Sequence, residues 1–192
     1  KKNARVVGPT SVGIISPEKC KVGPIGGINV ERVYKKGSVG VISKSGGMST
    51  ETSWVIRQAG LGQSTVVGLG GDFLSGSNFR DLLELFEKDK ETKAVALFGE
   101  LGGSYEEQAA EFMKQGGFTK PLVAFVAGKF TECMPGEMQF GHAGAIIEGK
   151  TGTPSGKIKA LKEAGAIIAS VHSEMGELVK EVIYSQPRKF HD

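Results

Sequence analysis

The sequence predicts an α/β fold built on a parallel β-sheet, because short apolar runs alternate with amphipathic stretches along most of its 192 residues. Each run has the length of a buried strand. The stretches between them carry apolar residues at helical spacing, and parallel strands need such crossover helices. The five expected strands are Val39–Ser43, Thr65–Leu69, Ala94–Phe98, Leu122–Val126 and Ala166–Ala169.

The glycine content supports the same fold class. Glycine accounts for 29 of 192 residues, about twice the usual share of roughly 7%. The glycines form neither a G-X-Y repeat nor a Gly/Ser tract, so the composition indicates neither collagen nor a linker. Pairs such as Gly46-Gly47, Gly70-Gly71 and Gly102-Gly103 follow apolar runs. In α/β proteins, loops at such places bring the backbone close to ligands.

Three of the crossovers are expected to be helical because they carry apolar residues at helical spacing. Those residues are Trp54 and Ile56, then Leu82, Leu83, Leu85 and Phe86, then Ala109, Phe112 and Met113. The fourth crossover, Ala127–Thr153, is rich in Gly and Pro and is expected to be a long loop before a helix over Lys157–Ala164. Long irregular loops of this kind usually carry function.

The first 36 residues differ from the rest of the chain. They contain one expected strand, Arg5–Val7, then a turn at Gly8-Pro9 and turn-rich sequence up to a break at Lys35–Gly37. We interpret residues 1–36 as the tail of a preceding domain and residues 37–192 as a complete α/β domain. The chain starts at Lys1, so we expect it to begin inside a longer polypeptide.

Composition argues against several classes of protein. The apolar runs fall well short of the about 18–20 residues that span a bilayer, so we expect no membrane segment. The basic residues are scattered among acidic ones at a net charge of +3, which argues against nucleic-acid binding. Cys20 and Cys133 have neither metal-like nor disulfide-framework spacing. That spacing favours a reducing compartment, and no metal site is expected in this chain.

Functional residues are expected beyond the carboxyl ends of the strands, where open α/β sheets bind ligands. Four loops reach that edge: Ser43–Met48, Gly70–Asp72, Gly99–Gly103 and the segment Gln139–Gly144. The first joins a strand directly to a helix. The N–H groups of Gly46, Gly47 and Met48, together with the positive end of the helix dipole, therefore form a potential phosphate site. A tight glycine turn without a ligand is the alternative interpretation.

His142 is the candidate nucleophile. Its neighbours Gly141 and Gly144 cover its ring little, and neutral imidazole can accept a phosphoryl group when a carboxylate orients its other ring nitrogen. Glu100, at the end of a neighbouring strand, is the candidate carboxylate. The alternative is a loop histidine that caps a backbone carbonyl. His172 is expected at the surface near a helix cap, and His191 lies in the tail.

One further motif matches a known pattern. Gly144–Thr151 satisfies the P-loop pattern G-x-x-x-x-G-K-[ST]. Its context is unsuitable, because the pattern needs a buried strand before it and a helix starting at the lysine, whereas Gly152-Thr153-Pro154 breaks a helix there. A P-loop NTPase remains an alternative function.

Taken together, these loops resemble one family. The motifs Ser43–Met48, Gly70–Asp72, Gly99–Gly103 and Gly141–Ala145 occur in the order and spacing of the α-subunit of succinyl-CoA synthetase and its relative ATP-citrate lyase, that is, the NDP-forming acid–CoA ligases. The resemblance runs from about Val6 to Val182. It implies a flavodoxin-like, doubly wound ligase domain preceded by the end of a Rossmann CoA-binding domain.

The resemblance also implies roles for individual residues. His142 becomes phosphorylated, Glu100 is its hydrogen-bonding partner, and the turn Ser45–Met48 (Ser45, Gly46, Gly47 and Met48) holds the phosphate. It further implies positions close to substrate or CoA, which are Thr10, Ser11, Gly71, Asp72 and Gly141. The implied reaction forms an acyl phosphate from a carboxylate through phosphohistidine and then the CoA thioester.

The cofactors and partners follow from the same resemblance. CoA is the acyl acceptor, and ATP or GTP with Mg²⁺ binds mainly to a separate β-subunit or a fused β-like ATP-grasp region. The assembly is expected to be a hetero-oligomer in the cytoplasm, or in the mitochondrial matrix for a eukaryotic succinyl-type enzyme. Cleavage of citryl-CoA would need another domain.

Two branches of the family compete for the substrate. Segments Gly8–Gly13, Ser45–Glu51 and Glu137–Phe140 look like the citrate-activating branch, that of ATP-citrate lyase and citryl-CoA synthetase, whereas Glu106–Phe112, Gly144–Ile147 and Gly152-Thr153 look like the succinyl branch. We favour citrate, because the citrate-like loops lie beside the inferred phosphate site and site loops determine specificity. A catalytically silent interaction domain is the remaining alternative to an enzyme.

Overall fold

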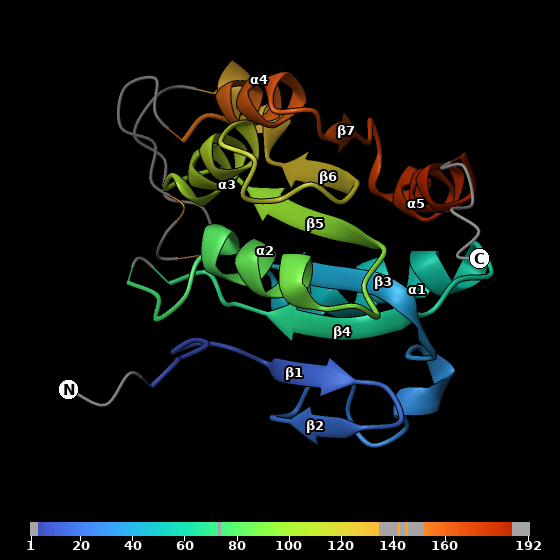
Figure 1. Cartoon of the computed structure of the whole chain (residues 1–192). Helices are drawn as coiled ribbons and strands as arrows, with labels where there is room; N and C mark the ends of the chain where they lie inside the picture. Colours follow the sequence, from blue (N-terminus) through green and yellow to red (C-terminus); the bar gives the residue numbers. More distant parts are fainter. Residues whose placement is uncertain (1–3, 73, 135–141, 143–144, 146–151, 186–192) are drawn as a thin grey trace.

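The computed structural model describes residues 4–72, 74–134, 142, 145 and 152–185, and its strands form a seven-stranded sheet. The strands lie in the order β2-β1-β4-β3-β5-β6-β7 (Figure 1). They are β1 (Gly13–Ser16), β2 (Cys20–Val22), β3 (Lys36–Ser43), β4 (Gln63–Gly68), β5 (Ala94–Glu100), β6 (Leu122–Ala127) and β7 (Ile167–Ile168).

The predicted five-stranded parallel sheet is present and consists of β4, β3, β5, β6 and β7. Numbered among themselves in chain order, they lie in the flavodoxin-like order 2-1-3-4-5. The predicted fold class is therefore confirmed. All five expected strands are present, although β7 is shorter than the expected Ala166–Ala169.

Helices cover both faces of the sheet. They are α1 (Gly46–Gln58), α2 (Phe79–Lys88), α3 (Tyr105–Lys114), α4 (Pro154–Glu163) and α5 (Met175–Ser185). Three short 3₁₀ helices lie in the connecting segments: η1 (Val30–Arg32), η2 (Lys129–Cys133) and η3 (His172–Glu174). One core layer joins α2, α3 and α4 to the sheet, and the other joins α1 and α5. Figure 1 shows α2 in front of the sheet and α1 behind it.

The two core layers follow from the period of a strand. Ile42 and Val67 point into the layer of α2, whereas their neighbours Val41 and Val66 point into the layer of α1. Since successive side chains on a strand face opposite sides, a strand covered on both faces must be apolar throughout. This explains why continuous apolar runs, rather than alternating ones, indicated the strands.

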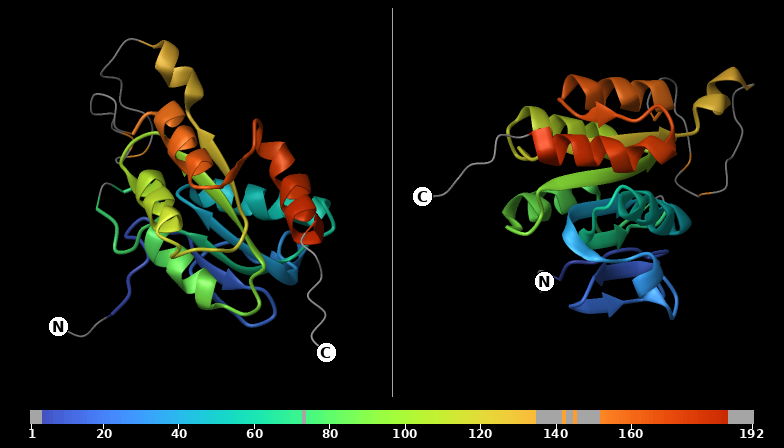
Figure 2. Two further views of the ribbon diagram at one scale, coloured as in Figure 1. Left: turned by 45° about the horizontal axis from the view of Figure 1, so that its top comes forward. Right: turned by 90° about the vertical axis from the view of Figure 1, so that its right-hand side faces the viewer.

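The structure differs from the prediction at the N-terminus. Residues Arg5–Val7 form no strand; instead β1 pairs antiparallel with both β2 and β4, so the hairpin extends the sheet at one end of the molecule (Figure 2). Gly13 has φ +109°, and a Cβ there would collide with the Val22 carbonyl. The place of β1 beside β4 was missed because that pairing joins residues far apart in sequence. The assignment of residues 1–36 to a preceding domain stays a prediction.

The long fourth crossover is described at its ends and at residues 142 and 145. It begins with η2 and ends at Thr153, whose side chain caps α4 by accepting the Gly156 N–H at 3.2 Å. The helix therefore starts at Pro154 rather than at the expected Lys157, because proline is well suited to the first turn of a helix. Residues 135–141, 143–144 and 146–151 lie outside the described part of the chain.

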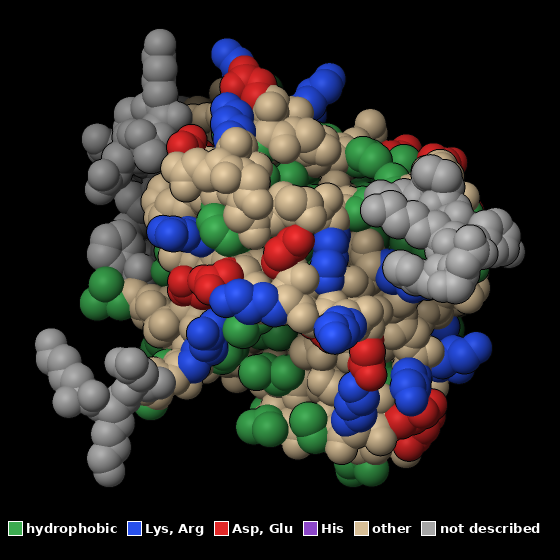
Figure 3. All heavy atoms as spheres, viewed as in Figure 1, with side chains coloured by type: hydrophobic (Ala, Val, Ile, Leu, Met, Phe, Trp, Pro, Cys, Tyr) green, Lys and Arg blue, Asp and Glu red, His purple; other side chains and the backbone are tan. Residues whose placement is uncertain are grey.

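The surface carries charges of both signs. On the face shown in Figure 3, lysine and arginine side chains alternate with acidic ones and do not gather into one basic stripe. Among the described helices, none combines the length and apolar character that a bilayer crossing requires.

His172 lies next to a helix N-cap as expected, but it is less exposed than expected. It is half-buried, its Nε2 lies 3.0 Å from the Thr52 hydroxyl oxygen, and its ring packs edge-on against Phe98 and Phe125 with centroids 5.9 Å apart. Burial lowers the pKa of His172, and the Glu51 carboxylate only partly opposes this. The folded state therefore favours the neutral ring.

This environment predicts a pH dependence of stability. Because the folded-state pKa lies below the ordinary value of 6.5, the unfolded chain binds a proton at His172 more readily, so the free energy of unfolding should fall as the pH drops below about 6.5. Thermal unfolding of the wild type and His172→Gln at pH 5.5 and 7.5 measures this. We expect a smaller pH difference in the variant, and equal differences would contradict the assignment.

Candidate active site

The candidate site lies at the carboxyl edge of the sheet, between the loops that follow β3 and β5. Ser43, the last residue of β3, is level with Gly68 of β4 and with Phe98 of β5. The chain passes from β3 to β4 on one side and then back to β5 on the other. This reversal makes the β3/β5 junction the switch point at which doubly wound sheets bind ligands.

The loop after β3 leads directly into α1. Ser45 is the N-cap of this helix, and its hydroxyl oxygen accepts the Met48 N–H at 3.4 Å. The Ser43 hydroxyl holds the turn by accepting the Ser45 N–H at 3.1 Å and donating to the Ser45 carbonyl at 2.7 Å. The helix has no acidic residue in its first turn, so its positive dipole end carries no compensating side-chain charge there.

The two glycines of this turn differ in their surroundings. A Cβ at Gly46 would collide with Val12 of the N-terminal segment, whereas a Cβ at Gly47 would meet no atom within 4 Å. Gly46 is therefore a packing requirement, and Gly47 faces open space. Of the predicted phosphate-binding residues, Met48 already shares its N–H with the Ser45 cap.

The structure brings together His142 and Glu100 as the sequence predicted. The His142 Nδ1 lies 2.8 Å from each carboxylate oxygen of Glu100. The His142 side chain is 41% exposed and that of Glu100 only 12%. A carboxylate acceptor at Nδ1 favours the tautomer with the proton on that nitrogen. The lone pair then resides on Nε2, on the opposite side of the ring from Glu100.

Gly71 forms the seat of the His142 ring. A Cβ at Gly71 would overlap the ring at Cγ and Nδ1. The loop after β4 thus needs glycine at this position so that the imidazole can lie against its backbone. Gly71, predicted to be close to substrate, is in contact with the candidate nucleophile itself.

The N-terminal segment borders the same loop. Asp72 accepts the Thr10 N–H at 2.6 Å and also pairs with the Thr10 hydroxyl, while the Ser11 hydroxyl donates to the Gly68 carbonyl at 2.5 Å. The Thr10 hydroxyl and N–H hold the pKa of Asp72 below its ordinary value, and His142 adds a smaller effect in the same direction. The hydrogen bonds of Thr10 and Ser11 therefore hold the N-terminal segment against the loop after β4, in which Gly71 contacts the His142 ring. Gly141 lies outside the described residues.

Sequence reasoning missed a buried charged cluster beneath these loops. Lys157 and Glu106 are fully buried and form an ion pair, Lys44 is 5% exposed with its Nζ 3.8 Å from Glu106, and Glu107 lies 3.5 Å from Lys157. The spacing of residues along α3 could have revealed this cluster. Glu106 falls on the same face of α3 as the core residues Ala109 and Ala110, where a charge is unusual.

The P-loop-like segment gains no support from the described residues. Most of Gly144–Thr151 lies outside them. The helix that follows, α4, begins at Pro154 and is capped by Thr153, so it does not start at Lys150 as the motif requires.

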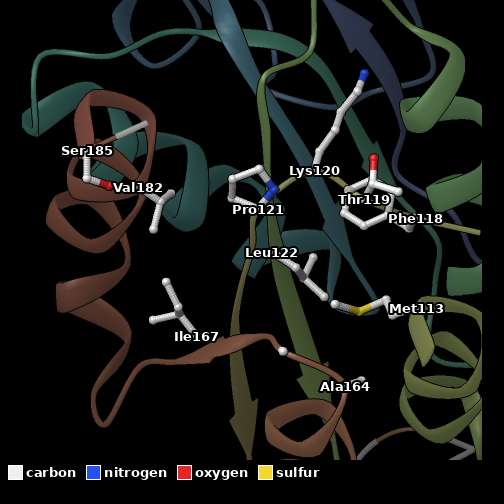
Figure 4. A pocket seen from close by; sticks show the side chains of 11 residues that line it. Met113, Phe118, Thr119, Lys120, Pro121, Leu122, Ala164, Ile167, Val182 and Ser185 are labelled. Carbon is white, nitrogen blue, oxygen red and sulfur yellow. The ribbon is translucent and has the colours of Figure 1, made fainter. Parts of the chain in front are cut away.

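A separate pocket lies at the opposite end of the sheet. Its volume is about 340 Å³, and its walls come from the start of β6, the ends of α3 and α5 and the turn after α4 (Figure 4). Lys120 at its rim donates to the carbonyls of Phe86 and Asp89, both at 2.6 Å, and so caps the end of α2. Its charge therefore has a structural role there.

Comparison with known proteins places the chain in a family. The family model described as CoA-ligase matches residues 42–167. The chain belongs to this CoA-ligase family, and the resemblance inferred from its loops is confirmed.

Individual relatives agree with this assignment. The chain is 48% identical over 180 residues to succinate–CoA ligase [ADP-forming] subunit alpha 2 of Archaeoglobus fulgidus. It is 45% identical over 181 residues to an ADP-forming sulfoacetate-CoA ligase subunit of Acholeplasma. Each alignment covers 94% of this chain and 60% of the relative, so the chain spans about three fifths of the length of these relatives.

A solved structure shows the same fold. ATP citrate lyase from Methanothrix soehngenii, in complex with citrate and coenzyme A, superposes with a TM-score of 0.89 at 35% identity. The superposition covers 94% of this chain and 30% of that protein. The chain therefore matches only one segment of that larger protein.

The contact between Gly71 and His142 generates a test of the site geometry. In Gly71→Ala the new Cβ should push the imidazole away from Glu100, because the two cannot occupy the same space. The ¹⁵N resonances of the His142 ring, which report the tautomer, should change. Gly47→Ala is the matched control, since its Cβ meets open space. An unchanged His142 spectrum in Gly71→Ala would contradict the described seat.

Proposed function

We propose that this chain is the phosphohistidine-bearing α-type part of an NDP-forming acid–CoA ligase. The observation that carries the proposal is the His142–Glu100 pair, with Nδ1 2.8 Å from the carboxylate, at the switch point of the sheet. An open helix N-terminus lies at the same edge. A partly exposed imidazole, an orienting carboxylate and an anion-binding turn are the three parts that phosphoryl transfer to histidine needs.

In this proposal His142 is the nucleophile. The lone pair of its Nε2 forms a bond to the γ-phosphorus of a nucleoside triphosphate as the bond from that phosphorus to the bridging oxygen breaks and the diphosphate leaves. The ring becomes positively charged as the new bond forms. Glu100 stabilises that charge through Nδ1–H, which costs little reorganisation because the hydrogen bond already exists.

The turn Ser45–Met48 would hold the phosphoryl group. Gly47 faces open space, so its N–H can approach an oxygen of the phosphoryl group closely. The dipole of α1 adds a positive potential at this point. Met48 contributes less, because Ser45 already accepts its N–H.

The second half of the reaction uses the segment beside His142. A carboxylate oxygen of the acid takes the phosphoryl group from Nε2 and gives an acyl phosphate. The thiol of CoA then attacks the acyl carbon, and inorganic phosphate leaves. The positions that we propose to lie near the acid or CoA are Thr10, Ser11, Gly71, Asp72 and Gly141.

The proposal also covers the acid substrate and the nucleotide-binding partner. Relatives are named for succinate and sulfoacetate, and a solved relative holds citrate and coenzyme A; all three acids carry a carboxylate. We retain citrate as the favoured acid on the basis of the site loops. ATP or GTP with Mg²⁺ would bind to a β-subunit or fused ATP-grasp region, consistent with the partial coverage of the relatives.

Covalent labelling tests the nucleophile. The full-length protein, assembled with its nucleotide-binding partner and given γ-labelled ATP or GTP, should acquire an acid-labile, base-stable label at His142. His142→Ala should lose all of it. His172→Ala is the matched control and should keep it, since the His172 ring is engaged with Thr52.

Other outcomes would identify another function. Label that persists in His142→Ala would refute the assigned nucleophile. Loss of nucleotide binding in Lys150→Ala would indicate the P-loop alternative. A wild type that never acquires label in a nucleotide-competent assembly would reduce the chain to an interaction domain.

Discharge of the label names the substrate. Phosphorylated protein is mixed with citrate, succinate or sulfoacetate in the presence of CoA, and the remaining label is measured over time. We expect citrate to remove it faster than the other two acids. Faster discharge by succinate or sulfoacetate would replace citrate while leaving the phosphohistidine assignment intact.

A further inference from the structure

Glu106 contacts the backbone of the residue that orients His142. It lies in the first turn of α3 and is fully buried. Its Oε1 accepts the backbone N–H of Glu100 at 3.0 Å, and its Oε2 pairs with the Lys157 ammonium. Gly99 leaves the space for this contact, because a Cβ there would come within 2.7 Å of Oε1.

The same carboxylate faces the phosphate-binding turn. Lys44 immediately precedes the N-cap Ser45, and its Nζ lies 3.8 Å from the Glu106 Oε1. It also donates to the Gly102 carbonyl at 3.1 Å and lies 5.1 Å from the centroid of the Tyr105 ring. Lys44 thus joins the loop after β3 to the loop after β5, and Glu106 lies between them.

Stability alone does not account for such a cluster. Burying charges removes them from water, and well-packed apolar side chains of similar size often stabilise a fold as well or better. A buried carboxylate has a different advantage here, because it offers fixed acceptors to a backbone N–H and to a cation at once. Those acceptors lie directly beneath the two loops of the candidate site.

We propose that Glu106 is a positioning residue that fixes Glu100 against His142 by holding the Glu100 backbone and the Lys157 ammonium on one carboxylate. This inference rests on the proposed function, since it assigns Glu106 a task in the phosphorylation of His142. Glu106 touches neither the imidazole nor a substrate; it acts through Glu100.

The chemistry of glutamine gives a sharp test. A carboxylate has two acceptor oxygens, whereas the amide of Glu106→Gln has one acceptor and one donor group. The Lys157 ammonium should take the single acceptor, which turns the NH₂ group toward the Glu100 N–H. Glu100 should then shift, and a displacement of about 1 Å at a catalytic group can lower a rate by about 100-fold.

The experiment measures single-turnover phosphorylation of His142 in the full-length, assembled protein. Glu106→Gln should slow it by up to about 100-fold. The double variant Glu106→Gln/Lys157→Met should recover much of the loss, because the amide oxygen is then free to accept the Glu100 N–H. Glu107→Gln is the matched control: it removes a neighbouring carboxylate 3.5 Å from the same Lys157 and should leave the rate nearly unchanged.

A double-mutant cycle separates positioning from stability. Glu100→Ala leaves no carboxylate at residue 100 for Glu106 to position. Adding Glu106→Gln to Glu100→Ala should therefore cause little further loss of rate. A structural role would give the same fold-loss with and without Glu100. Ring ¹⁵N resonances of His142 should also change in Glu106→Gln and return in the double variant.

The outcomes distinguish the two proposals. A wild type without label at His142 would refute the proposed function. A wild type that is labelled, together with equal rates in Glu106→Gln and Glu107→Gln, would refute only the positioning role. If Glu106→Gln does not fold, the rate of Glu106→Gln/Lys157→Met decides: a folded double variant as slow as Glu100→Ala would overturn the inference.

Discussion

The parallel register of β3 with its two neighbours is the constraint on which the candidate site depends. Ser43 lies level with both Gly68 and Phe98, so the loops after three strands emerge at one edge. A slip of one residue would exchange the two faces of a strand, so each apolar side chain would enter the core layer that fits its neighbour. Because both faces are apolar and covered by helices, packing resists that slip along the whole sheet. The edge therefore presents the proposed anion-binding turn, the His142 seat and Glu100 in a fixed arrangement.

Glycines, which have no side chain, are as important to this edge as the residues with reactive side chains. Gly71 makes room for the imidazole of His142, and Gly99 makes room for the carboxylate of Glu106. Both are positions where a methyl group would enter occupied space, although neither has an unusual φ. Gly47, in contrast, leaves open the space that the proposed phosphoryl group would use. The high glycine content thus reflects close approaches at the site as well as turns in the chain.

The sequence predicted the parts of this protein that depend on short-range pattern. The five parallel strands were visible because each is a continuous apolar run, and the rule that ligands bind at carboxyl ends placed His142 near Glu100. The place of β1 in the sheet was not visible, since it depends on pairing with β4, about 50 residues away in the chain. The partial burial of His172 was missed for the same reason: it comes from Phe98 and Phe125, which no local period reveals. The buried cluster needed both helix phase and tertiary contact to be seen.

The electrostatics of that cluster show how its members depend on one another. Burial lowers the pKa of Lys44, and Glu106 is the largest influence that raises it, while the nearby Lys157 lowers it further. The charged form of Lys44 is thus supported chiefly by the carboxylate that also holds Glu100. When the charge of Glu106 is lost, the pKa of Lys44 must fall again, and a neutral amine can remain buried at lower cost than an unpaired ammonium. Lys157, which is paired directly with the same carboxylate, then bears most of the penalty. This asymmetry is the physical reason why relief should come from Lys157 rather than from Lys44, and why one buried carboxylate can connect two loops whose sequences are far apart.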